Sequence, residues 1–475
     1  MAKALSYKSG TGYPIYVLIS LLVVCATVVL LTTPYPQFSF LPAFLIGIFL
    51  FLYRFSTAGF YIIVFLLPFG AFRNLWGPLA SVKIHWVLAF LLIVIIGVQL
   101  IVEKRFPRWL KMNLWPLLIF FLLANLVSTL LTDYPESARN SLLRLVVACF
   151  FIGLSLLLVD KKGFKTTLPK VLSVSISLSA FFAVIGYFFY VALFAADATA
   201  GEFTRGTGGT TWASSLSLSI VFAFPLLVYL IIHAQTVKSR LFYIFLASIN
   251  IGGMVTTFSR GGALILSIIL LLCAIHYRRY LKPKHFGFVF LFAGIIFTTV
   301  IAVTPPSYWE RQVSLTKWQD SSIGRRQAYL IVGWQSFKEH PFLGSGTGTF
   351  RDLYSKSNYA RVFAKEGSTT RRFAHNTYVE VLVGSGILGF LIFLLLLHRS
   401  WRNFSSAYKI FEENQAKEMM SIVFSYQMSF LAVLLYFFLH SGIDNKFFLL
   451  ILPISAISLR LARESRDSVQ SFTNL

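Results

Sequence analysis

His375 and Asn376 are the residues best placed to do chemistry, because they stand directly before a long apolar run, Val379 to Leu397. Thr377 and Glu380, three residues apart, have the spacing of a helix capping box. His375 should therefore lie just ahead of a helix N-terminus, whose positive dipole end disfavours imidazolium. The ring would stay neutral and could accept a proton as a general base, with Asn376 orienting it or its acceptor. The simpler interpretation of the pair is a turn followed by a helix cap.

A second candidate is Arg260, within the break Ser259-Arg260-Gly261-Gly262 (259–262). This break is the one interruption of the apolar sequence from Leu241 to Ile275. A single helix of that length would measure about 50 Å, which exceeds a hydrocarbon core of about 30 Å. Two short spans joined by a tight turn fit better, and the glycines would permit the turn. Arg260 is then either a side chain reaching the membrane surface or a guanidinium that binds phosphate or pyrophosphate.

Three further arginines stand beside glycines. Arg325 and Arg326 follow Gly324 at the start of a predicted surface helix, residues 323–340, which Pro341 ends. A helix start with arginines can hold a phosphate, although a solvated basic turn is the alternative. Arg205, in a glycine-rich outer loop, could help to bind the same substrate. Gly344 to Gly348 matches no nucleotide-binding loop and is interpreted as a flexible turn.

His440 and Asp444, in the turn HSGIDN, offer a second possible base, and Asp444 is a candidate substrate-binding residue. The sequence contains no cluster of carboxylates typical of a bound metal and no DxD pair typical of a nucleotide-sugar site. We therefore expect neither a metal nor another cofactor.

These residues must be positioned by membrane helices. The chain has 475 residues, 57% of them hydrophobic, and a mean hydropathy of +0.73. These values predict an all-α, polytopic transmembrane bundle of about 12–14 spans. The fourteen candidate spans are 15–33, 38–53, 57–72, 84–102, 114–132, 142–159, 169–194, 213–233, 240–258, 262–277, 286–303, 377–398, 420–440 and 446–461.

The distribution of basic residues sets the topology. With the N-terminus inside, the inner segments hold 24 Lys and Arg, the outer short loops and span ends hold 7, and the long loop 304–376 holds 11. Because long translocated loops count little in the positive-inside rule, both termini should be cytoplasmic. The long loop and Arg260 then lie on the outer side. We divide the chain into an N-terminal bundle of about eleven spans (1–303), a periplasmic loop (304–376) and C-terminal spans with a short tail (377–475).

Composition excludes other classes. The net charge of +24 could indicate nucleic-acid binding, but the basic residues fall between apolar spans and are not interleaved with aromatics on a polar face. The three cysteines, Cys25, Cys149 and Cys273, lie inside predicted spans and form no disulfide framework.

The second half of the chain resembles the O-antigen ligases and the related O-antigen and exopolysaccharide polymerases, bacterial membrane glycosyltransferases of the C type (GT-C). The resemblance rests on three segments in the family's order around one long loop: TFSRGGALILSIILL (257–271), GRRQAYLIVGWQSFKEHPFLGSGTGTF (324–350) and HNTYVEVLVGSGILGFLIFLLLL (375–397).

The resemblance implies transfer of a whole glycan from undecaprenyl pyrophosphate to an acceptor hydroxyl on the periplasmic face of the bacterial inner membrane. The acceptor would be lipid A core for a ligase or another lipid-linked glycan for a polymerase. It implies that Arg260 and Arg325 bind the pyrophosphate, that His375 activates the acceptor, and that the reaction is metal-independent and inverting. The expected partners are these two substrates and the lipid bilayer. A protein O-oligosaccharyltransferase and a lipid-linked glycan transporter remain alternatives.

Overall fold

The computed structural model describes residues 13–34, 36, 39–72, 84–103, 112–197, 204–278, 321–363 and 370–473. The predicted span 286–303 and the boundary between residues 303 and 304 lie outside these ranges. The chain separates into two units, one formed by residues 1–60 and 87–105 and the other by residues 61–86 and 106–475. All candidate site residues belong to the second unit.

The first unit contains α1 (Tyr13–Leu31), α2 (Leu41–Arg54) and most of α4 (Ile84–Glu103). Helix α3 (Ser56–Leu66) follows α2 after a single residue, and the two helices are bent by 113°. The sequence predicts two spans here, but the helices have only 14 and 11 residues. They meet the length and hydropathy of a membrane span only as a bent pair.

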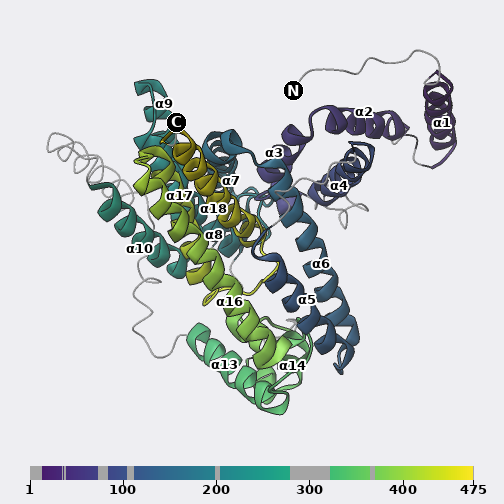
Figure 1. Cartoon of the computed structure of the whole chain (residues 1–475). Coiled ribbons are helices and arrows are strands. Elements are labelled where there is room, and N and C mark those ends of the chain that lie inside the picture. The colour runs from purple at the N-terminus through teal and green to yellow at the C-terminus, as the bar shows by residue number, and fades with distance from the viewer. Residues whose placement is uncertain are drawn as a thin grey trace. The chain divides into compact units, whose positions relative to one another are not determined.

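The second unit is a helical bundle (Figure 1). Its central helices are α8 (Ala213–Ile232) and α17 (Lys417–Tyr436), because 78% of the apolar window of each is buried, against 33% for α9 (Val237–Thr256) and α10 (Arg260–Tyr277). The other helices of the bundle are α5 (Trp115–Leu130), α6 (Pro135–Leu158), α7 (Leu168–Phe189), α16 (Thr377–Glu413) and α18 (Lys446–Thr473).

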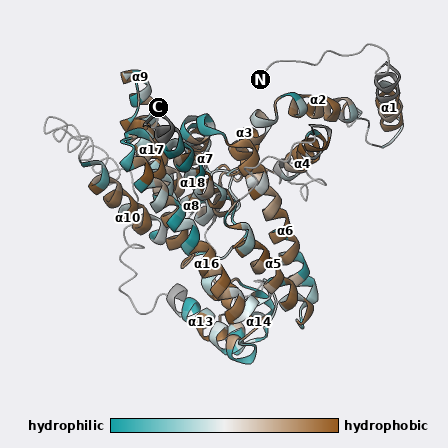
Figure 2. Ribbon diagram, viewed as in Figure 1, coloured by the Kyte–Doolittle hydropathy of each residue, from teal (hydrophilic) through white to brown (hydrophobic). Residues whose placement is uncertain are grey.

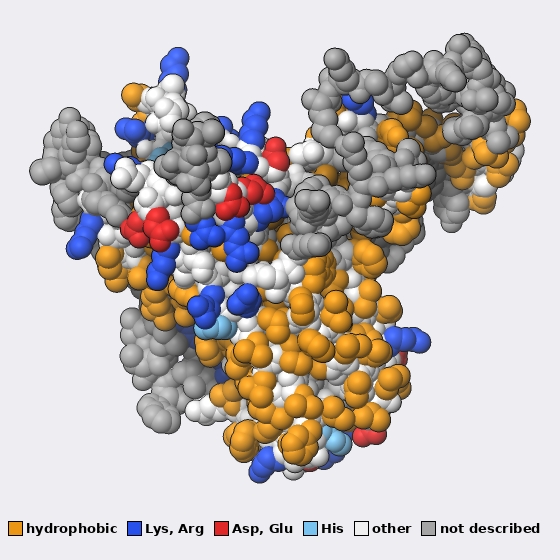
Figure 3. All heavy atoms as spheres, in the orientation of Figure 1, with side chains coloured by type: hydrophobic (Ala, Val, Ile, Leu, Met, Phe, Trp, Pro, Cys, Tyr) orange, Lys and Arg blue, Asp and Glu red, His pale blue; other side chains and the backbone are white. Residues whose placement is uncertain are grey.

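The bundle has the surface of a multi-pass membrane protein. Seven described helices are long and apolar enough to cross a membrane, or eight with the bent pair counted as one span. Apolar residues run along α5 and α6 (Figure 2), and apolar side chains cover this face of the second unit, while charged ones gather toward its ends (Figure 3). Such a band is stable only against lipid or another apolar partner. The all-α, polytopic expectation is confirmed.

The described part of the long loop, residues 321–363 and 370–376, is mostly helical. It contains α13 (Ser321–Glu339), α14 (Phe350–Lys356) and α15 (Asn358–Val362), and α13 confirms the predicted surface helix. Figure 1 shows α13 and α14 at the end where α16 begins. A small apolar core holds these helices to α16, and its buried members are Ala328, Tyr329, Val332, Phe350, Tyr354, Ala360, Ala374 and Val383.

A short antiparallel hairpin, β1 (Ala195–Asp197) and β2 (Thr204–Gly206), is the one sheet in the described part of the chain. The sequence predicts only a glycine-rich loop here. Gly208 and Gly209 follow with φ of 59° and 83°, a backbone conformation that residues with a Cβ rarely adopt.

Helix α16 is broken at Gly386 (φ 61°, ψ −169°), and the glycine turn of the long loop docks into the break. The amides of Ser345 and Gly346 donate to the carbonyls of Val383 and Gly384, at 2.8 and 3.1 Å. On the far side of the break, the amide of Ile387 donates to the carbonyl of Pro341 at 2.8 Å. Backbone groups exposed by the break are thus satisfied by protein, as a membrane span requires.

Two glycines make this docking possible. A Cβ on Gly344 would lie 2.5 Å from the Gly386 nitrogen, and a Cβ on Gly386 would lie 2.3 Å from the Phe342 carbonyl oxygen. The turn predicted for residues 344–348 is confirmed. Its consequence is that the long loop is fixed to the first nine residues of α16, which begins at Thr377, two residues after His375.

Candidate active site

The break before Arg260 is confirmed, because α9 ends at Thr256 and α10 begins at Arg260. The Ser259 hydroxyl caps α10 by accepting from the Gly262 amide at 3.2 Å. The reversal itself occurs at Phe258, a fully buried residue with φ of 51°.

Contrary to the expectation from the sequence, the glycines of this motif do not provide the turn. Gly261 and Gly262 lie in the first turn of α10 and are not among the residues with positive φ. A Cβ on Gly261 would lie 2.3 Å from Leu439, and one on Gly262 would lie 1.7 Å from the Ser217 hydroxyl. The glycines therefore allow α10 to pack closely on α8 and on the turn after α17, which contains His440.

His375 occupies the corresponding position before α16, with φ of 50° and an exposed side chain. The predicted capping box at Thr377 is wrong by one residue. Asn376 is the N-cap, and its Oδ1 accepts from the Val379 amide at 3.1 Å. The Thr377 hydroxyl instead donates to the His440 carbonyl at 2.7 Å, and Glu380 accepts from the Ala374 amide at 2.9 Å.

These hydrogen bonds define what each residue can still do. The Oδ1 of Asn376 caps the helix, as the simpler interpretation of this residue predicts. Nδ2 is then the atom that remains for an interaction with substrate. Glu380 and Thr377 hold the segment before α16 from both sides. His375 is thereby fixed at the surface in a backbone conformation that costs free energy for a residue with a Cβ, a feature that clusters at functional sites.

His375 and His440 are neighbours, with ring centroids 6.5 Å apart. Desolvation by the surrounding protein, then His440, then Arg326, Arg372 and Arg325, lowers the pKa of His375 below its ordinary 6.5. Burial lowers the pKa of His440 to about 4, partly opposed by the Asp444 carboxylate. Both imidazoles are neutral at pH 7, as the sequence analysis predicted for His375, although nearby positive charges and desolvation add to the helix dipole proposed there.

The predicted arginines approach this pair from different elements. Arg325 and Arg326 lie in the second turn of α13, and not at its start as the sequence predicts, and they act electrostatically on His375. Arg205, on β2, donates from Nε to the carbonyl of Thr257 at 2.7 Å, directly beside the break before Arg260. This bond satisfies a carbonyl at the end of α9, so part of the role of Arg205 is structural.

Tyr436, near the end of α17, connects these groups. Its side chain interacts with Ser259 and lies within electrostatic range of both Arg205 and Arg326. Its ring centroid is 6.0 Å from that of His440. The structure therefore brings Arg205, the Ser259–Arg260 break, Arg326 and the two histidines to one region, although they are far apart in sequence.

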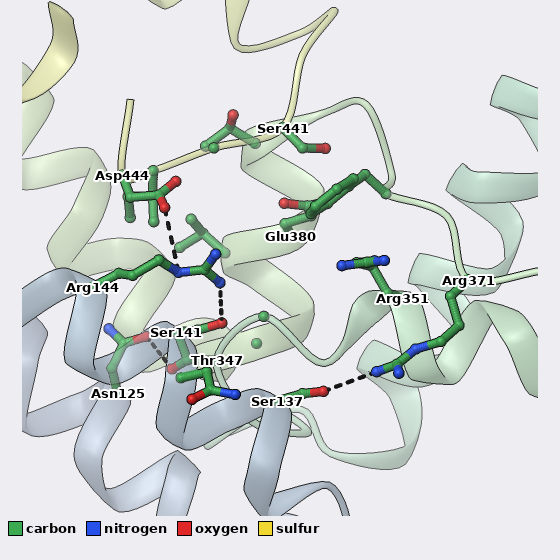
Figure 4. A pocket seen from close by; sticks show the side chains of 18 of the residues that line it. Asn125, Ser137, Ser141, Arg144, Thr347, Arg351, Arg371, Glu380, Ser441 and Asp444 are labelled. Atoms are coloured by element: carbon green, nitrogen blue, oxygen red, sulfur yellow. Dashed lines mark hydrogen bonds and ion pairs between the residues drawn. The ribbon is translucent and has the colours of Figure 1, made fainter. Parts of the chain in front are cut away.

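A polar cavity of about 470 Å³ lies on the other side of the start of α16 (Figure 4). Of the site residues predicted from sequence, Asp444 is the one that lines it. Its carboxylate pairs with Arg144 of α6 at 3.4 Å, and Arg144 also donates to the Ser141 hydroxyl at 2.9 Å. The remaining polar residues of the lining are Asn125, Glu136, Ser137, Asn140, Thr347, Arg351, Arg371, Thr377, Glu380 and Ser441.

The cavity was not predicted from the sequence. One signal was present, since Glu136, Asn140 and Arg144 recur every four residues and so share one face of a helix. The predicted span begins at residue 142, whereas α6 begins at Pro135. Arg351 and Arg371 carry no such signal, because the fold of the loop brings them to the cavity.

In the part of the chain that the structure describes, no group of three His, Cys, Asp or Glu side chains could bind a metal ion. The chemistry that this region offers is proton transfer at a neutral imidazole beside several guanidinium groups. Such a combination suits displacement at a carbon that carries an anionic leaving group.

Comparison with known families agrees with this geometry. Residues 245–394 match the family model described as O-antigen ligase. The match begins in α9, includes the Ser259–Arg260 break, α13 and the glycine turn, and ends within α16. No curated protein matches the chain. Residues 245–394 thus carry a match to the O-antigen ligase family, within a multi-pass membrane protein.

Proposed function

We propose that the protein is a glycosyltransferase of the bacterial inner membrane that moves a glycan as one unit from undecaprenyl pyrophosphate to a sugar hydroxyl. The favoured form is an O-antigen ligase with lipid A core as acceptor, working on the periplasmic face with both termini cytoplasmic. The observation that carries this proposal is the convergence of a neutral His375 with arginines from β2 and α13 beside the break before Arg260.

In this mechanism a ring nitrogen of His375 takes the proton of the acceptor hydroxyl while its oxygen attacks the anomeric carbon. The bond between that carbon and the pyrophosphate oxygen breaks, and undecaprenyl pyrophosphate leaves with the bonding electrons. Attack from the opposite side inverts the anomeric centre. Arg260 and Arg325 stabilise the charge on the leaving group, where preorganised donors act most strongly.

The remaining predicted residues have supporting parts. Arg326 and Arg205 extend the binding of the pyrophosphate, and Asn376 and Asp444 contact the glycan. Because nearby guanidinium groups hold the pKa of His375 low, a bound pyrophosphate would offset their charge and raise this pKa. His375 therefore becomes a stronger base when the donor is bound. No metal or other cofactor takes part in any step of the proposed mechanism.

The experiment uses the full chain in lipid nanodiscs, with chelator and without nucleotide. Undecaprenyl-pyrophosphate-linked glycan from the native host is supplied alone or with lipid A core. Product that forms only with core supports a ligase. Longer lipid-linked chains without core identify a polymerase, which would use the same residues. Transfer onto protein would identify an oligosaccharyltransferase, and unchanged donor in all tubes would overturn the proposal.

A further inference from the structure

The cavity beside the start of α16 has one wall made by a single face of α6. Glu136, Ser137, Asn140, Ser141 and Arg144 occupy successive turns of this helix and all line the cavity. The opposite wall comes from the loop that contains Arg351 and Arg371, from the start of α16, and from the turn with Asp444 (Figure 4). The volume, about 470 Å³, lies in the range of small-molecule sites, roughly 300–1,000 Å³.

The lining is charged but balanced, which distinguishes it from the arginine-rich surroundings of His375. Its ionisable residues are three arginines and three carboxylates: Arg144, Arg351, Arg371, Glu136, Glu380 and Asp444. A pyrophosphate would gain little from such a mixed set, because Glu136 and Asp444 would repel it. A ligand whose hydroxyl groups both donate and accept hydrogen bonds can use both kinds of side chain.

Two features indicate that the cavity is built to exchange hydrogen bonds. The Arg144–Asp444 pair is half-exposed, so it contributes little to stability and can open at small cost. Nε of Arg351 is a buried atom without a hydrogen-bond partner among the described groups. Buried polar atoms normally have partners, and an incoming ligand could provide them.

The cavity also contains aromatic faces. Phe121 and Phe373 line it, and the Arg351 guanidinium lies 4.7 Å from the centre of the Phe373 ring. Phe373 is 46% exposed, so its ring remains accessible. A few convergent polar groups beside apolar faces are the usual composition of a small-molecule site, and a sugar ring offers both surfaces.

The cavity is directly connected to the proposed base. Thr377, two residues after His375, lines it and donates to the His440 carbonyl. Asp444 lies in the cavity and acts electrostatically on His440, whose ring neighbours that of His375. The start of α16 thus contributes to the cavity lining and also holds the segment that carries His375.

We propose that this cavity binds an uncharged sugar residue of the acceptor glycan, and that the polar face of α6 determines which sugar is accepted. The proposal rests on the function proposed above and identifies the acceptor subsite of the same reaction. Because α6 lies outside residues 245–394, acceptor choice is separated from the domain that carries the chemistry.

The test measures binding of delipidated oligosaccharides to the full chain in nanodiscs by saturation-transfer NMR and calorimetry. One arm uses the core oligosaccharide of the native host and another uses its free glycan repeat unit, since either could be the acceptor. Asn140→Trp fills the cavity and Arg144→Gln removes one donor. Arg139→Gln is the matched control, because Arg139 is exposed on the same helix and does not line the cavity.

We expect saturable binding of one oligosaccharide, a loss of at least about tenfold in affinity in both cavity variants, and unchanged affinity in the control, since each lost polar contact is worth about a factor of ten. In the transfer assay the cavity variants should raise KM for the acceptor more than they lower kcat. No binding by the native chain, or equal binding by all variants, would overturn the inference. Binding with no transfer would keep the inference and reject the proposed reaction.

Discussion

The starts of α10 and α16 are built by the same backbone device and used in different ways. Each helix is preceded by a residue with a side chain in the left-handed conformation, Phe258 with φ of 51° and His375 with φ of 50°. Each has a polar N-cap, Ser259 or Asn376. Phe258 is 1% exposed and its ring packs against that of Tyr187 at 5.9 Å, whereas His375 is exposed.

This contrast separates two reasons for keeping a strained residue. At Phe258 the cost, about 1–3 kcal/mol, is offset by burial of a large ring. At His375 the exposed side chain recovers little by burial, so the conformation serves to present the imidazole beside the arginines. One reversal therefore fixes the architecture, and the other displays a reactive group.

The largest effect on glycan transfer is expected at His375. His375→Ala should reduce glycan transfer by about 10² to 10⁴-fold, the usual contribution of a general base, while the thermal unfolding midpoint stays unchanged. The measurement is initial transfer rate in nanodiscs with saturating donor. His340→Ala is the control, because His340 is an exposed histidine in the same loop, at the end of α13. Full activity of His375→Ala would reject His375 as the base and turn attention to His440.

The next effect belongs to Arg260, which begins α10 next to the buried reversal. Arg260→Ala and Arg325→Ala should each lower kcat by about 10² to 10³-fold, because each removes a donor to the leaving pyrophosphate. A lysine at either position should restore only part of the rate, since it keeps the charge without the planar fork. Arg361→Ala, an exposed arginine of α15, should transfer glycan normally.

Phe258 should behave in the opposite way. Phe258→Ala leaves a cavity beside Tyr187 and should lower the free energy of unfolding by about 3–5 kcal/mol. His375→Gly should cause no such loss, because glycine adopts positive φ freely and little buried surface is removed. Thermal unfolding of purified protein measures both. Equal destabilisation by the two variants would show that burial of the side chain matters as much at His375 as at Phe258.

The smallest expected effect is a displacement of the pH profile. A base must be neutral, so kcat/KM should rise with pH through the pKa of His375 and level off, with the acidic limb below 6.5 in the native chain. Arg372→Gln removes a positive charge that lowers this pKa, so its limb should move to higher pH. Arg361→Gln should leave the limb in place. A limb at the same pH in all three proteins would mean that another group titrates.

Hydropathy and charge by themselves determined much of this protein. They predicted the helical membrane bundle, the break at residues 259–262, the surface helix α13 and a neutral His375 before a span. The fold class and the surface helix agree with the structure, whereas the break lies at residues 257–259 and Arg260 already begins α10. These features follow from properties of short segments: the length of an apolar run, the chemistry of helix ends and the preference of lipid for apolar side chains.

Tertiary structure decided what depends on close approach between distant segments. Gly261 and Gly262 are needed for packing rather than for a turn, and Gly344 and Gly386 allow the long loop to enter the break in α16. Asn376 rather than Thr377 caps α16, because the Thr377 hydroxyl donates to the His440 carbonyl, in the turn after α17. Local sequence gives no signal for such contacts, since the space around a side chain is set by residues many positions away in the chain.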